Sequence, residues 1–225
     1  MQDERYLQLL SRKFPNAQSV VTELINLRAI LSLPKGTEHF VSDLHGEANA
    51  FIHMIKNASG VIRKKVDEAY GDSLCEEEKR ALCALIYYPD ERIDLVKRKH
   101  KGQPNNALQE GFDYSNMYEW YKRRLHQVVA IARAITIKYT RSKVYKHLPK
   151  DYAYVIKELL HESSLEQKDR QAYYNAVIEA IIETGCAEQL LISITYFIHS
   201  MAIDMLHIVG DIFDRGPRPH KILDV

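Results

Sequence analysis

Residues 205–216 read MLHIVGDIFDRG, a short apolar and β-branched run followed by a polar loop. A run of this kind is typical of a buried strand. In open α/β sheets, ligands bind beyond the carboxyl ends of the strands, so we expect this loop to carry chemistry. Asp211 offers a carboxylate whose two oxygens can bridge two cations, and Arg215 offers a planar donor fork for phosphate. Gly210 and Gly216 permit close approach of the backbone.

A second strand and loop are indicated at residues 38–47, which read EHFVSDLHGE. Polar and apolar residues alternate over strand length, and apolar residues then recur at helical spacing. Asp43 and His45 stand two positions apart, so both side chains can turn toward one point. A carboxylate and an imidazole together suit manganese, iron or zinc. An Asp-x-His pair is common by chance, so the metal-site hypothesis depends on the two loops together.

Between these loops, residues 61–203 show helical periodicity almost throughout and no convincing strand. Ser73-x-x-Glu76 has the form of a capping box that starts one helix. The longest helical pattern covers residues 115–148 and carries an apolar stripe. The stripe residues expected in a core are Trp120, Leu125, Val128 and Ile135. We therefore predict an α/β protein with a long helical stretch in its middle.

Composition excludes several classes of protein. The 225 residues are 46% hydrophobic and 27% charged, which is ordinary for a globular chain. With 31 Lys and Arg against 30 Asp and Glu, the net charge of +1 provides no global field for nucleic acid or an anionic membrane. The most apolar stretch, residues 190–203, is too short to span a bilayer. Three cysteines without a CxxC pair favour a reducing compartment, and we expect the cytoplasm.

The two motifs, Asp-x-His and Gly-Asp-x-x-Asp-Arg-Gly, resemble the first two signatures of the calcineurin-like metallophosphoesterases. Asp43, His45, Asp211, Asp214 and Arg215 match them residue by residue. With the opening YLQLLS and the helical stretch, the chain looks like the class III fructose-1,6-bisphosphatases of Firmicutes and related bacteria. The likeness runs through essentially the whole chain.

The resemblance implies part of a metallophosphoesterase α/β sandwich with a long all-helical insertion. Residues 1–60 would form the first part of the core, residues 61–203 the insertion, and residues 204–225 the return to the core. It also implies metal-dependent hydrolysis of fructose 1,6-bisphosphate, a small sugar bisphosphate, in gluconeogenesis. A homo-oligomer and a nucleotide or metabolite effector are further expectations.

The resemblance also assigns roles to the matching residues. A pair of divalent cations, usually manganese with iron or zinc possible, would clamp the 1-phosphate. Asp43 and His45 would ligate the first metal, and Asp211 would bridge both. Asp214 would orient a catalytic histidine, and Arg215 would hold the phosphate as a catalytic and phosphate-binding residue.

The sequence departs from the family pattern after Arg215. The family's third motif, Gly-Asn-His followed by Asp or Glu, does not occur, and the chain holds no Asn-His pair. We therefore expect an N-terminal part of a longer enzyme that is inactive alone. Two alternatives stay open: another calcineurin-like phosphatase, acting on phosphoproteins or dinucleoside polyphosphates, and a non-catalytic helical module for assembly or effector binding. The basic run at residues 97–101 is expected to be a solvated face.

Overall fold

The computed structural model describes residues 2–100, 117–161, 168–213 and 216–224. The helices are α1 (Gln2–Lys13), α2 (Ala17–Leu31), α3 (Ala48–Asn57), α4 (Val61–Tyr70), α5 (Glu76–Tyr87), α6 (Pro89–His100), α7 (Met117–Thr136), α8 (Arg141–Lys146), α9 (Ala153–His161), α10 (Lys168–Glu183) and α11 (Ala187–Ala202). The strands are β1 (Glu38–Ser42) and β2 (Met205–Val209), and the short 3-10 turns are η1 (Ala58–Gly60), η2 (Gly71–Ser73), η3 (Lys150–Tyr152) and η4 (Pro219–Asp224). In this part of the chain, no helix combines the length and apolarity that a bilayer crossing demands.

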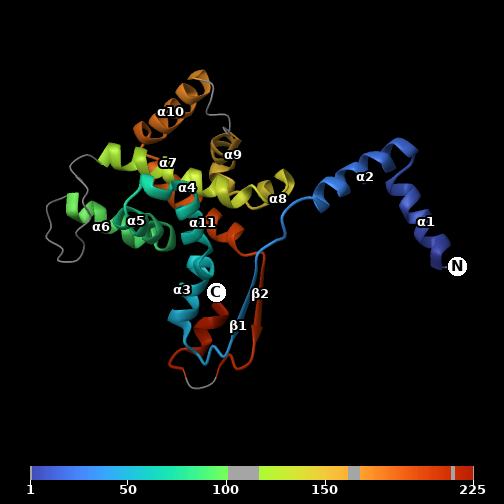
Figure 1. The fold of residues 1–225 in the computed structure, drawn as a ribbon, viewed down its shortest axis with the longest axis horizontal. Helices are drawn as coiled ribbons and strands as arrows, with labels where there is room; N and C mark the ends of the chain where they lie inside the picture. Colours follow the sequence, from blue (N-terminus) through green and yellow to red (C-terminus); the bar gives the residue numbers. More distant parts are fainter. Residues whose placement is uncertain (1, 101–116, 162–167, 214–215, 225) are drawn as a thin grey trace.

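β1 and β2 pair in parallel, although most of the helices lie between them in sequence. The register aligns Glu38 with Met205 at one end and Ser42 with Val209 at the other. Figure 1 shows the two strands side by side below the helical body, with α3 next to them. Both predicted strands are therefore confirmed, and their carboxyl ends lie next to each other.

The helical body packs around α7 and α11, which run along each other at its centre. The expected core residues are all buried there, including Trp120 at 5% exposure and Leu125 and Val128 at 0%. Within residues 61–203, the described positions form helices and turns and no strand, as the periodicity predicts. The division of the chain into three domains stays a prediction.

The predicted helix over residues 115–148 is wrong in one respect, because the structure breaks it after Thr136. Thr140 caps a new helix, α8, by accepting a hydrogen bond from the amide of Lys143 at 3.3 Å. Between the two helices, the Tyr139 hydroxyl donates to the carbonyl of Met201 at 3.0 Å. The N-cap residue Thr140 is a local signal for this break, whereas the contact of Tyr139 with Met201 is long-range.

The start of α5 also differs from the sequence interpretation. The helix begins at Glu76 with Cys75 as its N-cap, and the Glu78 carboxylate accepts a hydrogen bond from the Cys75 amide at 3.1 Å. Ser73 instead closes a turn by donating to the carbonyl of Tyr70 at 2.5 Å. The capping box exists, but it lies two positions later than the Ser-x-x-Glu pattern indicates.

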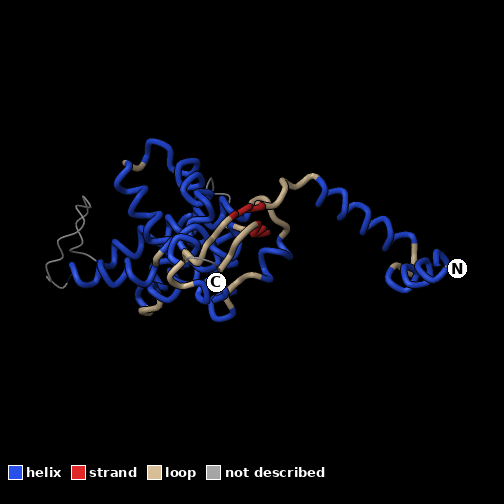
Figure 2. The backbone as a smooth tube through the Cα atoms, turned by 90° about the horizontal axis from the view of Figure 1, so that it is seen from below, coloured by secondary structure: helices blue, strands red, loops and turns tan. Residues whose placement is uncertain are grey.

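α1 and α2 form an arm that projects away from the body, as Figures 1 and 2 show from two directions. Asn16 caps α2 by accepting a hydrogen bond from the Ser19 amide at 2.9 Å. No residue of α2 is buried. The arm therefore folds through local helix signals rather than through packing on the body.

The described residues form one two-stranded sheet, so the fold is α/β with a predominance of helix. A sandwich needs a second layer of sheet packed on the first. On this two-stranded sheet, the apolar side chains of Phe40 and Val209 are 70% and 60% exposed, so no such layer covers them among the described residues. The metallophosphoesterase sandwich implied by the resemblance stays a prediction.

Candidate metal and phosphate site

The loops that follow β1 and β2 stay hydrogen-bonded after the strands end. The amide of Asp43 donates to the carbonyl of Val209 at 3.2 Å, and the amide of His45 donates to the carbonyl of Asp211 at 3.1 Å. The amide of Gly46 then donates to the carbonyl of Ile212 at 2.9 Å. These backbone hydrogen bonds continue the strand pairing into the two motif loops and fix the register of one loop against the other.

The two predicted aspartates meet through this ladder. The Asp43 Oδ1 atom lies 3.4 Å from the backbone nitrogen of Asp211 and accepts its hydrogen bond. Both aspartates are exposed, and His45 is half-buried. The structure therefore brings the three residues of the metal-site hypothesis to one edge of the sheet.

Gly210 makes this approach possible. Its φ of +97° lies in a region that L side chains rarely adopt. A Cβ at this position would overlap the Asp43 carboxylate oxygen. The second motif therefore needs a glycine before its aspartate, because the carboxylate of the first motif fills the space.

The Asp-x-His loop has a left-handed backbone on both sides of one buried residue. Asp43 and His45 have φ angles of +51° and +46°, which are uncommon for residues other than glycine. Leu44 between them is 9% exposed and packs in a small apolar cluster with Phe51 of α3 and Ile222 of η4. Strain of this kind persists where the surroundings over-determine it, and it concentrates at functional sites. Burial of Leu44 holds the two polar neighbours in place.

A cavity of about 280 Å³ opens beside this loop. Its polar lining comes from Asp43, His45 and Glu47. Its apolar lining comes from β1, from the loop that follows it and from α3, namely Val41, Leu44, Ala50, Phe51 and Met54. Sequence reasoning assigned no role to Glu47, although its place two residues after the histidine is the signal that could have found it.

The end of the second loop returns against the first. A Cβ on Gly216 would overlap the carbonyl oxygen of His45, so the two backbones are in direct contact. The amide of Arg218 reaches the carbonyl of Gly46 at 3.4 Å. Asp214 and Arg215, the predicted orienting and phosphate-binding residues, lie outside the described residues, and their roles stay predictions.

The donor types fit a divalent cation, since carboxylate oxygen and imidazole nitrogen suit manganese, iron and zinc. In the described ranges, however, no group of three or more His, Cys, Asp or Glu side chains is arranged to hold a metal. The Asp43 oxygen is instead engaged by the Asp211 amide. Asp43, His45 and Asp211 are thus neighbours in the fold, but their side chains are not arranged as a set of metal ligands.

Comparison with known proteins places the chain in a family. The family model described as Firmicute fructose-1,6-bisphosphatase matches residues 5–225. The chain is 50% identical over 224 residues to the fructose-1,6-bisphosphatase class 3 of Phocaeicola vulgatus, covering 100% of this chain and 31% of that protein. It is 49% identical to the protein of the same name from Porphyromonas gingivalis, covering 99% of this chain and 32% of that protein.

The likeness extends to Clostridium tetani, whose fructose-1,6-bisphosphatase class 3 is 47% identical over 222 residues, 99% of this chain and 31% of that protein. The chain thus spans about a third of the length of these curated relatives. No solved structure matches it. Because the family match covers almost the whole chain and both strand-end motifs, the chain belongs to the Firmicute fructose-1,6-bisphosphatase family.

Proposed function

We propose that this chain supplies Asp43, His45 and Asp211 to the metal centre of an enzyme that hydrolyses fructose 1,6-bisphosphate to fructose 6-phosphate and phosphate. The observation that carries the proposal is the contact between the two motif loops, in which the Asp43 carboxylate reaches the Asp211 amide at 3.4 Å. The class 3 relatives bear the name of this activity. Manganese is the proposed metal.

In this proposal, the motif residues would hold the metal ions and the substrate phosphate. A pair of divalent cations, when bound, lowers the pKa of water and stabilises the charge that develops on phosphoryl oxygens. The Asp43 side chain would leave the Asp211 amide to become a ligand, and its half-buried neighbour His45 would supply nitrogen. Asp214 would orient a histidine and Arg215 would grip the phosphate with its planar fork.

We further propose that the 225-residue chain by itself has negligible activity. It offers two carboxylates and one imidazole from the motif loops and contains no Asn-His pair to complete a second metal's ligands. The activity is therefore proposed for the whole protein, measured on a chain as long as its relatives.

Replacement of Asp211 by asparagine tests the proposal. In the full-length enzyme, Asp211→Asn should lower fructose 1,6-bisphosphatase turnover by at least about 100-fold, because it removes charge from both metals at once. The measurement is phosphate release across a manganese titration, with metal content determined on the same samples. Asp72→Asn changes an exposed carboxylate on η2 and serves as the control.

Normal turnover and normal manganese content in Asp211→Asn would contradict the bridging role. Activity of the unaltered enzyme on a phosphoprotein or a dinucleoside polyphosphate, with none on fructose 1,6-bisphosphate, would instead contradict the substrate. Arg215→Lys should be milder than Asp211→Asn, because lysine keeps the charge and loses only the bidentate geometry.

A further inference from the structure

A second cavity, of about 250 Å³, lies where the segment before β1 meets α4 and the end of α7. Four of the side chains that line it are lysines, which come from three separate segments. They are Lys35, Lys64, Lys65 and Lys138. The remaining lining consists of Thr37, Glu68 and the apolar residues Val61, Ile135 and Ala202. We call this cavity the lysine pocket.

The acidic side chains at the lysine pocket do not balance its lysines. Glu68 pairs with Lys65 at 2.6 Å and with Lys64 at 4.0 Å. Asp204 pairs with Lys138 at 3.4 Å and also with Lys143 from α8. Counting the described residues that line the pocket or pair with its lining, four ammonium groups face two carboxylates, Glu68 and Asp204. An excess of two positive charges is left at one cavity of a chain whose net charge is only +1.

Part of this charge is held away from water. The Lys138 side chain is 17% exposed. Its pKa is lowered mainly by burial, with further lowering from the charges of Lys143 and Lys65 against the opposing effect of Asp204. His39 of β1 also has a lowered pKa, from burial first and from the Lys138 charge second. A bound anion would relieve this repulsion.

We propose that the lysine pocket binds a small anion that carries a phosphate group. Lysine ammonium groups are compact cations that bind phosphate as point charges. Thr37 adds a hydroxyl at the same cavity, and the apolar floor suits a short carbon chain. The cavity volume suits a small metabolite, since pockets for drug-sized ligands begin at about 300 Å³. This site is separate from the metal site and does not depend on the proposed function.

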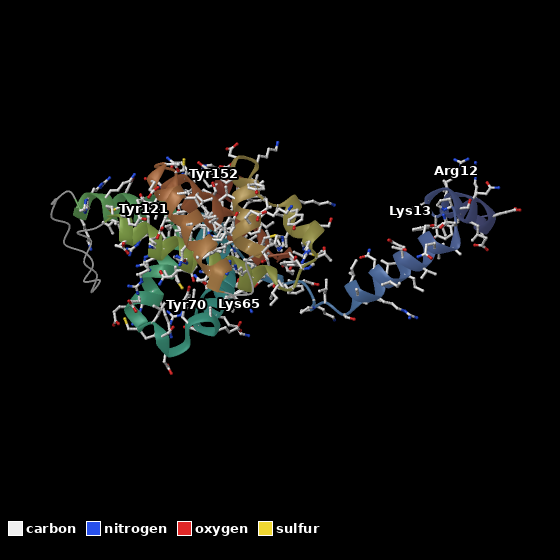
Figure 3. The ribbon with its side chains drawn as sticks, turned by 90° about the horizontal axis from the view of Figure 1, so that it is seen from above. Arg12, Lys13, Lys65, Tyr70, Tyr121 and Tyr152 are labelled. Carbon is white, nitrogen blue, oxygen red and sulfur yellow. The ribbon has the colours of Figure 1, made fainter. Side chains whose placement is uncertain are left out.

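The basic run at residues 97–100 is a weaker candidate for an anion site. In the basic run at the end of α6, Lys97 is already paired with Glu188. Figure 3 labels Lys65 on the side of the helical body where the segment from α2 enters. An anion in the lysine pocket would therefore contact both this entering segment, through Lys35, and the body, through Lys65 and Lys138.

Pyrophosphate is the probe, titrated calorimetrically into the full-length protein in metal-free buffer that contains EDTA. Lys35→Gln and Lys65→Gln should each weaken binding by about tenfold, as expected for the loss of one charged contact to phosphate. Lys150→Gln removes an exposed lysine of η3 and should leave the affinity unchanged. Because metal is absent, the result is independent of whether the motif loops form a phosphatase site.

Glu68→Gln should change the pyrophosphate affinity in the opposite direction. It removes the carboxylate that competes for Lys64 and Lys65, so pyrophosphate should bind about threefold more tightly. A variant that damages the fold would not tighten binding. The proposal is overturned if Lys35→Gln and Lys65→Gln bind like Lys150→Gln, or if Glu68→Gln binds no more tightly than the unaltered protein.

Discussion

At position 210 a methyl group would overlap the Asp43 carboxylate, so Gly210 is a small residue that the motif loops require. Gly210→Ala should lower the free energy of unfolding by about 2–3 kcal/mol, since it adds a steric overlap with the Asp43 carboxylate to the cost of a positive φ. Urea unfolding of the variant measures this change. It should also weaken manganese binding, because the displaced carboxylate is a proposed ligand.

Gly60→Ala is the matched control for this residue. Gly60 has a similar φ of +87°, but a Cβ there would meet nothing within 4 Å. The Gly60→Ala variant should therefore lower the free energy of unfolding by only about 1 kcal/mol, from the strained backbone, and leave manganese binding unchanged. Equal losses in the two variants would show that the overlap with Asp43 is not a constraint.

At the scale of elements, the Asp204 carboxylate ties the starts of both strands to the helical body. It accepts hydrogen bonds from the amide of Thr37 at 2.6 Å, from the Tyr139 hydroxyl and from Lys143. Burial alone would raise its pKa, but the bonds from Lys143, Tyr139 and Thr37, with the charge of Lys138, lower the pKa to about 2. The ionised form is therefore the one that stabilises the fold.

Asp204→Asn should accordingly lower the free energy of unfolding by roughly 2–3 kcal/mol at neutral pH. The folded pKa lies below the ordinary aspartate value of about 4, so this stabilisation is fully present above pH ~4 and is lost as the pH falls toward 2. Urea unfolding across this pH range should show the two proteins converging at its acid end. Asp151→Asn, an exposed carboxylate on η3, should show no such convergence. A constant difference down to pH 2 would contradict the assignment.

The elements differ in how far the sequence predicts them. The strands and the motif loops follow from apolar runs that end in polar residues, and those signals are local. The break after Thr136 has one local signal, the N-cap residue Thr140, but the contact of Tyr139 with Met201 is long-range, and no pattern within residues 115–148 reveals it. The lysine pocket escapes sequence reasoning for the same reason, because its lysines come from segments that only the fold brings together.

At the scale of the whole molecule, the arm formed by α1 and α2 projects away from the helical body. Deletion of residues 1–33 should leave the melting temperature of the body unchanged within about 2 °C, because α2 buries no residue and the arm makes no extensive contact with the described body. Differential scanning calorimetry of the two chains, with circular dichroism to confirm loss of helix, measures this. A fall of more than about 5 °C, roughly 2 kcal/mol for a chain of this size, would show that the arm supports the body.

The parallel pairing of β1 with β2 has a consequence for the order in which the chain folds. Thr37 and Asp204 stand 167 positions apart, and closing so long a loop from an unfolded chain costs about 4–5 kcal/mol of entropy. Helices need only local contacts and form much sooner. Once α4 to α11 have packed, the ends of that loop are already near each other, and the strands can pair at little further cost. We therefore expect the motif loops, which depend on this pairing, to acquire native structure after the helices that lie between the two strands, and a ribosome must deliver the chain as far as Asp211 before that residue can meet Asp43.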